Sequence, residues 1–374
     1  VQFPRAFVQG FLTARGAANS HTGILARTLG VPAVSQLPVD AQLQGRTAIL
    51  NGDEGTLILD PDEDQLRAAE TGIRARQAQR EALQQLAKLP SVTKDGHAIR
   101  LYANLAGTDD LPLLQQSGAE GVGLLRSEFL YLGRSSCPTE DELFASYRQL
   151  VQAMDGREII IRTLDIGADK KADYFDLPPE DNPALGLRAI RLCLTRPALL
   201  QTQLCAILRA SAFGNVGVMF PMVTNLEDWD EAMRLVARCR QLLRERGEEF
   251  DPNTPFGVMF GVPSACLTAE EFVEHGCNFF VIETNDLTQY THAVDRDISI
   301  AERYYRPASH AMKKLIRMVV EAAREGGIPV TICGSAVGNP ANTLQYLQLG
   351  LRSFSVSPQN LIEVKKALMN AKIK

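Results

Sequence analysis

Charged and reactive side chains recur in this chain directly after short apolar runs. The residues concerned, each with the run before it, are Arg126 (121–125), Arg162 (159–161), Glu283, Asn285 and Asp286 (279–282), and Cys333 (329–332). Guanidinium groups bind anions bidentately, carboxylates and amides offer oxygens to hard cations, and a thiol can donate a proton. The spacing therefore predicts one polar face built from the carboxyl ends of several strands.

The apolar runs predict a parallel sheet that is buried on both faces. Eight strands are expected after residue 97, at 98–104, 121–125, 157–163, 216–222, 256–260, 278–282, 329–333 and 353–356. Helical patterns separate them, most clearly at 140–154, 226–246 and 310–325. Eight strands that alternate with helices are typical of a (β/α)8 TIM barrel, whose active face lies at the carboxyl ends of the strands. A doubly wound open sheet is the alternative, but no Gly-rich phosphate loop follows the first strand.

Composition restricts the class of protein. The net charge of −5 provides no basic field, so we expect no nucleic-acid partner, and the charge of any anionic substrate must be met by individual arginines. The seven cysteines show no CxxC spacing, which favours a reduced, cytoplasmic protein without a disulfide framework or structural zinc. No apolar run is long enough to insert into a membrane, and no signal-peptide pattern stands at the start.

The first quarter of the chain has a different organisation. Residues 1–61 contain short strand-like pieces at 47–50 and 56–59 around an Asn-Gly turn. Residues 62–90 are rich in Gln, Ala, Arg and Glu and predict a long solvated linker helix. We therefore divide the chain at these positions and assign residues 91–374 to the barrel.

A histidine follows a helix-capping serine in the segment 16–27. His21 comes directly after Ser20 and before a helical run, where free backbone N–H groups can hold a phosphate that the imidazole has captured. A capping residue without chemistry is the alternative for a lone histidine. The particular string around His21 favours the first interpretation.

This string also carries a resemblance to a known family. It is similar to the phosphohistidine motif of the PEP-utilising enzymes, where PEP is phosphoenolpyruvate. The chain as a whole resembles Enzyme I of the phosphoenolpyruvate:sugar phosphotransferase system, including the Enzyme I modules of multiphosphoryl transfer proteins. The matching segments are, in chain order, 16–27, 118–130, 162–170, 182–191, 207–214, 284–290, 294–296 and 333–334. Each segment alone is weak evidence for the resemblance, but the whole set in this order is specific to the family.

The resemblance implies a reaction, a cofactor and partners. PEP would pass its phosphate to His21 Nε2 with release of pyruvate, and the phosphate would then go to a histidine of the phosphocarrier HPr. Mg²⁺ would neutralise the phosphoryl group, and the barrel would form a homodimer. The matching site residues are His21 and Cys333 for catalysis, Arg126, Arg162, Arg188, Asn285 and Arg296 for substrate binding, and Asp286 for metal binding.

Several positions depart from the family pattern. Gly261 stands where the family has a second metal-binding glutamate, and Ser335 stands where it has an acid after Cys-Gly. Ala17 replaces a glycine of the histidine motif. Glu283 replaces a glycine and is a candidate compensating metal ligand, although it would point away from Asp286 if the strand continued to that residue.

Two alternatives follow from these departures and from the length of the chain. A PEP-binding sensor or scaffold of the same fold would keep the ligand site and lose the chemistry through Gly261 and Ser335. Pyruvate phosphate dikinase and PEP synthase share the motifs but need an ATP-binding domain for which the chain has no room. We also expect the phosphohistidine domain to be incomplete and the HPr-docking domain to be missing.

Overall fold

The computed structural model of the chain describes residues 8–14, 31–37, 39, 43–167, 173–295 and 303–373. Two compact units are present, Val1–Ala82 and Leu83–Lys374. The boundary between them lies within the long helix α2 (Glu63–Ala87), where the sequence predicted a linker helix. Each unit is described by itself below.

The first unit contains two small sheets. Strands β1 (Phe11–Thr13) and β2 (Ala33–Ser35) pair in parallel. Strands β3 (Ala48–Asn51) and β4 (Thr56–Leu59) form an antiparallel hairpin. The Asn51 side chain accepts hydrogen bonds from the backbone of Asp53 and Glu54 and so closes the predicted turn. Most of α2 also belongs to this unit.

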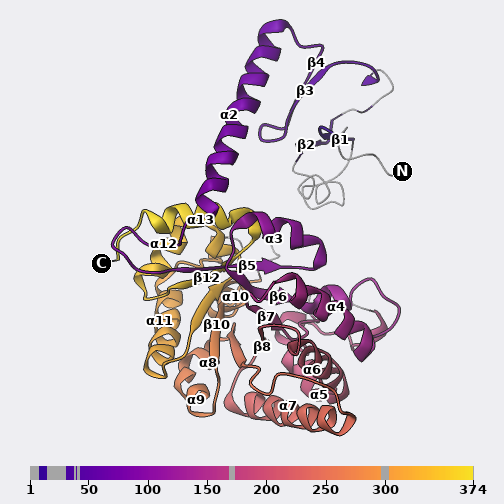
Figure 1. The fold of residues 1–374 in the computed structure, drawn as a ribbon, viewed down its shortest axis with the longest axis vertical. Helices are drawn as coiled ribbons and strands as arrows, with labels where there is room; N and C mark the ends of the chain where they lie inside the picture. The colour runs from indigo at the N-terminus through magenta and orange to yellow at the C-terminus, as the bar shows by residue number, and fades with distance from the viewer. Residues whose placement is uncertain are drawn as a thin grey trace. The chain divides into compact units, whose positions relative to one another are not determined.

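The second unit is a closed barrel of eight parallel strands surrounded by helices (Figure 1). Around the barrel the strands follow one another in chain order, and β12 closes on β5. The strands are β5 (Arg100–Leu105), β6 (Gly121–Arg126), β7 (Ile159–Arg162), β8 (Val216–Phe220), β9 (Phe256–Phe260), β10 (Phe279–Glu283), β11 (Val330–Cys333) and β12 (Ser353–Val356). This topology confirms the predicted (β/α)8 barrel and excludes the open doubly wound sheet.

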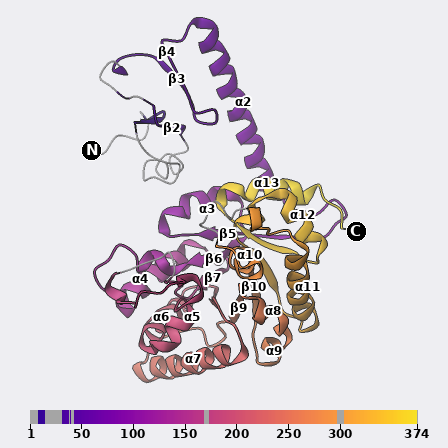
Figure 2. The same ribbon diagram turned by 180° about the vertical axis from the view of Figure 1, so that it is seen from behind.

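Helices connect successive strands and cover the outside of the barrel, as the opposite view in Figure 2 also shows. They are α3 (Leu111–Ser117), α4 (Glu140–Ala153), α5 (Ile190–Thr195), α6 (Pro197–Ser211), α7 (Leu226–Arg246), α8 (Pro263–Leu267), α9 (Ala269–Glu274), α10 (Thr284–His292), α11 (His310–Glu325), α12 (Pro340–Gln348) and α13 (Pro358–Met369). Local capping explains several boundaries. Thr139 and Glu142 form a capping box at the start of α4, and Gly247 ends α7 in a left-handed conformation.

Alternating strand residues build two cores. Side chains that point outward pack against the helices in the large core. Those that point inward fill the barrel with a separate cluster of Leu124, Ile160, Met219, Met259, Phe279, Val281 and Cys333. Glycine makes room there: a Cβ on Gly257 would lie 2.5 Å from the Phe279 ring. The lumen is thus packed solid, and the chemistry must take place at a mouth of the barrel.

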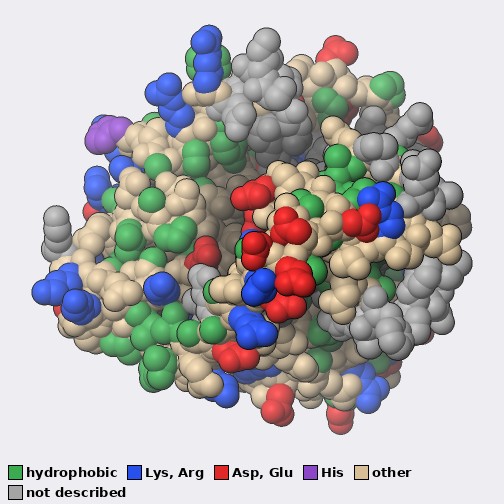
Figure 3. All heavy atoms as spheres, turned by 90° about the horizontal axis from the view of Figure 1, so that it is seen from above, with side chains coloured by type: hydrophobic (Ala, Val, Ile, Leu, Met, Phe, Trp, Pro, Cys, Tyr) green, Lys and Arg blue, Asp and Glu red, His purple; other side chains and the backbone are tan. Residues whose placement is uncertain are grey.

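Surface charge is mixed, and Figure 3 shows Lys and Arg side chains interspersed with Asp and Glu side chains on the face seen from above. This pattern agrees with the small net charge of −5. In the portion of the chain that the structure describes, no helix is both long enough and apolar enough to cross a bilayer.

Candidate active site

The predicted strand-end residues gather at the carboxyl ends of the barrel strands. Arg126 ends β6 and Arg162 ends β7, and the parallel register places the two residues directly beside each other. On the neighbouring pair β10 and β11, the register places Glu283 beside Cys333. Because every strand runs in the same direction, residues far apart in the sequence share one mouth of the barrel.

Two buried arginines form the centre of this mouth. Arg162 is 3% exposed and Arg188 is 2% exposed. Asp165 lies between them: its Oδ2 is 3.1 Å from Arg162 Nη1, and Arg188 Nη2 donates to both carboxylate oxygens at 2.9 and 3.0 Å. Glu128 is a second partner of Arg162. The guanidinium groups are therefore held in fixed orientations by carboxylates, as a bidentate anion site requires.

Both arginines stay charged in spite of their burial. Burial lowers the pKa of Arg162, but the carboxylates of Glu128 and Asp165 outweigh it and raise that pKa above its ordinary value. Burial likewise lowers the pKa of Arg188, and Asp165 and Asp286 more than compensate. The site therefore offers two permanent cations in a region of low dielectric, where their attraction for an anion is strongest.

Helix α10 brings Asp286 and Tyr290 to the same region. Asp286 Oδ1 lies 3.6 Å from Arg188 Nη1, and the Tyr290 hydroxyl accepts a hydrogen bond from Arg188 Nη1 at 3.1 Å. Asp286 is in the first turn of the helix and is buried. Arg188 thus joins the loop after β7 to the start of α10.

Cys333 faces the carboxylate of Glu283. The Cys333 thiol donates to Glu283 Oε2 at 3.4 Å, and the other oxygen, Oε1, accepts from the backbone N–H of Asn285 at 3.0 Å. Burial, and then the nearby carboxylate, raise the pKa of the Cys333 thiol well above its ordinary value. The thiol is therefore protonated at neutral pH and suited to giving a proton to a carbanion.

Asn285 is held by the serine that departs from the family pattern. Its Oδ1 accepts from the Ser335 backbone N–H at 2.9 Å and from the Ser335 hydroxyl at 2.7 Å. Ser335 begins a 3-10 helix, Ser335–Gly338, directly after the Cys333-Gly334 pair. The loop that carries Cys333 is thereby tied to the start of α10.

Gly261 lies against Asp286. A Cβ placed on Gly261 would be 3.0 Å from Asp286 Cβ and 3.6 Å from its Oδ2. A carboxylate at position 261 would therefore stand beside that of Asp286, whereas Glu283 has its contacts with Asn285 and Cys333. Among the residues that the structure describes, no group of three or more His, Cys, Asp or Glu side chains could hold a metal ion.

Two predicted site residues, His21 and Arg296, lie outside the described residues. The remaining ones, Arg126, Arg162, Arg188, Glu283, Asn285, Asp286 and Cys333, all lie at the carboxyl end of the barrel or in the loops that follow it.

The sequence did not assign the buried polar residues that orient this site. Gln203, on the outer helix α6, accepts a hydrogen bond from Leu164 N at 2.9 Å. Its Nε2 donates to Ser127 Oγ at 3.0 Å and to Tyr147 OH at 2.9 Å. Gln203 thus anchors the chain after Arg126 and after Arg162. The i, i+3 spacing of Arg162 and Asp165 in the sequence could have predicted their ion pair. No pattern in the sequence around Gln203 could have predicted its role.

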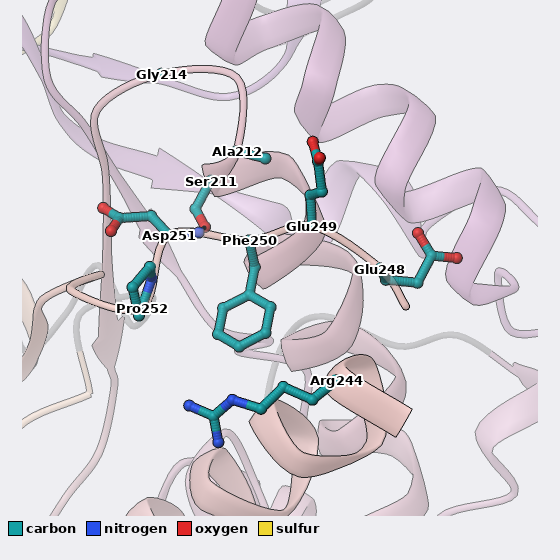
Figure 4. A pocket seen from close by; sticks show the side chains of 9 residues that line it. All are labelled: Ser211, Ala212, Gly214, Arg244, Glu248, Glu249, Phe250, Asp251 and Pro252. Carbon is teal, nitrogen blue, oxygen red and sulfur yellow. Dashed lines mark hydrogen bonds between the residues drawn. The ribbon is translucent and has the colours of Figure 1, made fainter. Parts of the chain in front are cut away.

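A cavity of about 680 Å³ lies at the opposite end of the barrel (Figure 4). Its lining comes from the loops that precede β8 and β9 and from the adjoining helix ends: Ser211, Ala212, Gly214, Arg244, Glu248, Glu249, Phe250, Asp251 and Pro252. The Arg244 guanidinium lies 5.6 Å from the centre of the Phe250 ring. These loops join the amino ends of strands, so the cavity is separate from the arginine and cysteine site.

Comparisons with known proteins identify two matching sequence profiles. The profile of the PEP-utilising enzyme, PEP-binding domain, matches residues 80–373, and that of the PEP-utilising enzyme, mobile domain, matches residues 2–55. The phosphoenolpyruvate-protein phosphotransferase of Bacillus subtilis (strain 168) is 39% identical over 97% of this chain and 64% of its own length. The enzyme of the same name from Staphylococcus carnosus (strain TM300) is 38% identical over 98% and 64%. The chain therefore spans just under two thirds of these relatives.

One similar solved structure is a ternary complex of malate synthase from Haloferax volcanii. It is 12% identical, covers 76% of this chain and 71% of that one, and has a TM-score of 0.48.

Proposed function

We propose a function from one premise: this chain belongs to the PEP-utilising enzyme family, as its two profile matches show. The proposed activity is that of a phosphoenolpyruvate-protein phosphotransferase of the Enzyme I type. In this reaction PEP gives its phosphate to a histidine of the enzyme, pyruvate leaves, and the phosphate passes to a carrier protein. The chain spans 64% of the length of its Bacillus subtilis relative, and its two profile matches cover the PEP-binding domain and the mobile domain.

The observation that carries this proposal is the pair of buried, carboxylate-oriented arginines at the mouth of the barrel. PEP bears a phosphate and a carboxylate, and each of these anions offers a pair of oxygens that a guanidinium group binds bidentately. Arg162 and Arg188 supply two such groups, and Arg126 stands beside Arg162 at the end of β6. We assign these three residues, with Asn285 and Arg296, to binding PEP.

Cys333 is proposed as the acid that completes pyruvate formation. Loss of the phosphate leaves an enolate, whose terminal carbon must gain a proton to become the methyl group of pyruvate. The Cys333 thiol is buried, protonated and hydrogen-bonded to Glu283, so a proton is available at Sγ. The Glu283 carboxylate also fixes the direction of the Cys333 S–H bond.

The residues present fit a Mg²⁺ ion that is bound largely through substrate. Mg²⁺ commonly takes one or two protein carboxylates and completes its octahedron with phosphate oxygens and water. Asp286 supplies one carboxylate, and the bare Cα of Gly261 leaves space beside it that a side chain would otherwise fill. When bound, the ion neutralises charge on the phosphoryl group. Glu283 is the second candidate ligand, but its present partners favour a role at Cys333.

The proposal extends to residues and partners beyond the described barrel. We assign the phosphate-accepting role to His21 Nε2 and assign residues 1–61, 62–90 and 91–374 to the phosphohistidine segment, linker helix and PEP-binding barrel. HPr or an HPr-like domain is the proposed acceptor, a second copy of the barrel the proposed dimer partner, and the cytoplasm the proposed location.

A PEP-binding sensor or scaffold is the second candidate. It is favoured by Gly261, which supplies no metal ligand, and by Ser335, which occupies Asn285 Oδ1 through both its backbone and its hydroxyl. Under this alternative PEP binds without reacting.

One experiment separates the two candidates. The chain is incubated with PEP and Mg²⁺, pyruvate is measured with a lactate dehydrogenase assay, and binding is measured by calorimetry. Pyruvate that forms together with phosphate on His21, located by mass spectrometry, and that is absent from Cys333→Ala, would support the phosphotransferase. PEP binding with neither pyruvate nor phosphohistidine would support the sensor. Absence of PEP binding would refute both.

A further inference from the structure

Two buried cysteines on neighbouring helices lie outside the proposed site. Cys205 is on α6 and Cys239 is on α7, and these two helices pack against each other. Cys205 is 1% exposed and Cys239 is 0% exposed. The Cys239 thiol lies 3.7 Å from the carbonyl oxygen of Gln201, which is one helical turn before Cys205. The Cys239 sulfur therefore reaches across the helix seam to the turn that ends at Cys205.

The two thiols differ in how readily they lose a proton. A hydrogen bond from the Cys239 thiol lowers the pKa of Cys205, and Arg246 and Arg209 act in the same direction against burial and Glu140. The same interaction, followed by burial, raises the pKa of Cys239. Arg209 and Arg246 are fixed in this position because both pair with Glu140, at 3.0 and 2.9 Å. Of the two sulfurs, Cys205 is therefore the one whose thiolate is favoured, and Cys239 is the one that holds its proton.

We propose that Cys205 and Cys239 form a reversible disulfide when the protein meets a peroxide, which makes this pair an oxidative modification site remote from the mouth of the barrel. Disulfide formation between a thiolate and an adjacent resolving thiol is the usual fate of such a pair. The other cysteines differ. Cys193, Cys266 and Cys277 are buried thiols whose pKa burial raises to about 12, and Cys137 is exposed.

The chemistry balances with hydrogen peroxide as the oxidant. The Cys205 thiolate attacks one peroxide oxygen, and the O–O bond breaks. The departing hydroxide combines with the proton that Cys205 gave up and forms water. The Cys239 sulfur then attacks the sulfur of the resulting Cys205 sulfenic acid. The S–O bond breaks, and the departing hydroxide takes the Cys239 proton. Two thiols lose two electrons, and the peroxide is reduced to two waters.

The cavity at the amino end of the barrel is lined by residues of the same two helices that carry the pair. Ser211 and Arg244 line it from the last turns of α6 and α7 (Figure 4). Ser211 is six residues after Cys205, which corresponds to roughly 9 Å along the helix. Glu248, also in the lining, lies 3.4 Å from Arg209 Nε. The charged cluster that favours the Cys205 thiolate therefore extends to the lining of this cavity.

The test uses the full chain carrying Cys137→Ser, which removes the exposed thiol. After exposure to hydrogen peroxide, we expect two thiols per chain to disappear, a mass loss of about 2 Da for two hydrogens, and a linked peptide that joins residues 205 and 239. Dithiothreitol should restore both thiols. Cys205→Ser and Cys239→Ser should each abolish the linked peptide, whereas Cys266→Ser, a matched buried cysteine on α8, should leave it unchanged.

Circular dichroism of every variant checks that it is folded. The linked peptide in the Cys137→Ser parent tests the proposal without relying on the other variants. Oxidation of the urea-unfolded chain should give mixed linkages, since the pairing depends on the packing of α6 on α7. The proposal is overturned if the folded parent keeps all its remaining thiols under peroxide, or if its linkages are as mixed as those of the unfolded chain.

Discussion

Replacing Arg162 with alanine should damage the protein in two separable ways. The first is loss of PEP affinity, because a charge-assisted bidentate contact disappears. We expect a cost of about 2–4 kcal/mol, or roughly a 30- to 900-fold weaker Kd. The second is loss of fold stability, because Glu128 is buried and pairs with Arg162. Asp165 retains its contacts with Arg188 at 2.9 and 3.0 Å.

The stability cost follows from the partner that remains. Removing one member of a buried ion pair costs about 3–5 kcal/mol, because the other charge is left in a low dielectric. Only Glu128 loses its arginine, so we place the cost near the lower end, which corresponds to a fall in Tm of about 6–10 °C for a unit of this size. The double variant Arg162→Ala/Glu128→Gln should recover part of the Tm, because it removes the buried carboxylate charge that has lost this arginine. It should not recover PEP affinity.

Arg126 provides the matched control. It is half-buried, lies directly beside Arg162 in the sheet, and takes part in none of the ion pairs found among the described residues. Arg126→Ala should therefore weaken PEP binding with little change in Tm. The assays are calorimetry with PEP below each variant's Tm and thermal unfolding by fluorescence. Wild-type PEP affinity in Arg162→Ala, or an unchanged Tm, would show that the reasoning is wrong.

Three further predictions concern the metal, the acid and the buried thiols. Gly261→Glu should strengthen Mg²⁺-dependent PEP binding, because the new side chain starts 3.6 Å from Asp286 Oδ2, and Glu283→Gln should leave the metal titration nearly unchanged. Identical curves for both variants and the wild type would mean that neither position reaches the metal. Cys333→Ala should bind PEP normally and form no pyruvate, and pyruvate formation by this variant would remove Cys333 from the mechanism. Burial and the nearby Asp165 raise the pKa of Cys193 from 9.0 to about 12, so its stabilising contribution is present below pH 9 and is lost as the pH rises toward 12. Urea unfolding between pH 9 and 11 should show a smaller decline for Cys193→Ala than for the wild type, and equal declines would contradict the assignment.

The sequence by itself predicted the barrel and the residues at its mouth. Strands in a parallel barrel are buried on both faces, so they leave continuous apolar runs, and polar residues can follow only where a strand leaves the core. That constraint acts between residues close in the sequence, so the apolar runs alone put Arg162 and Cys333 at strand ends. The helical patterns, which are also local, predicted the helices at 226–246 and 310–325 at their observed bounds.

Tertiary structure decided which side chains meet. The sequence suggested that Glu283 and Asp286 would diverge along an extended strand, but β10 ends at Glu283 and α10 begins at Thr284. Both carboxylates are buried, and Glu283 is directed to Cys333, its register partner on β11. Such a partner depends on the register and closure of the barrel, which no local periodicity encodes.

The same reason explains the other contacts that the sequence did not predict. Gln203 orients the chain after two strands from an outer helix, and Cys205 meets Cys239 only because α6 packs on α7. Periodicity in a sequence reports whether a residue faces the core. Which residue it faces is set by how whole elements pack, and for this chain that packing determines both the orientation of the arginines and the pairing of the thiols.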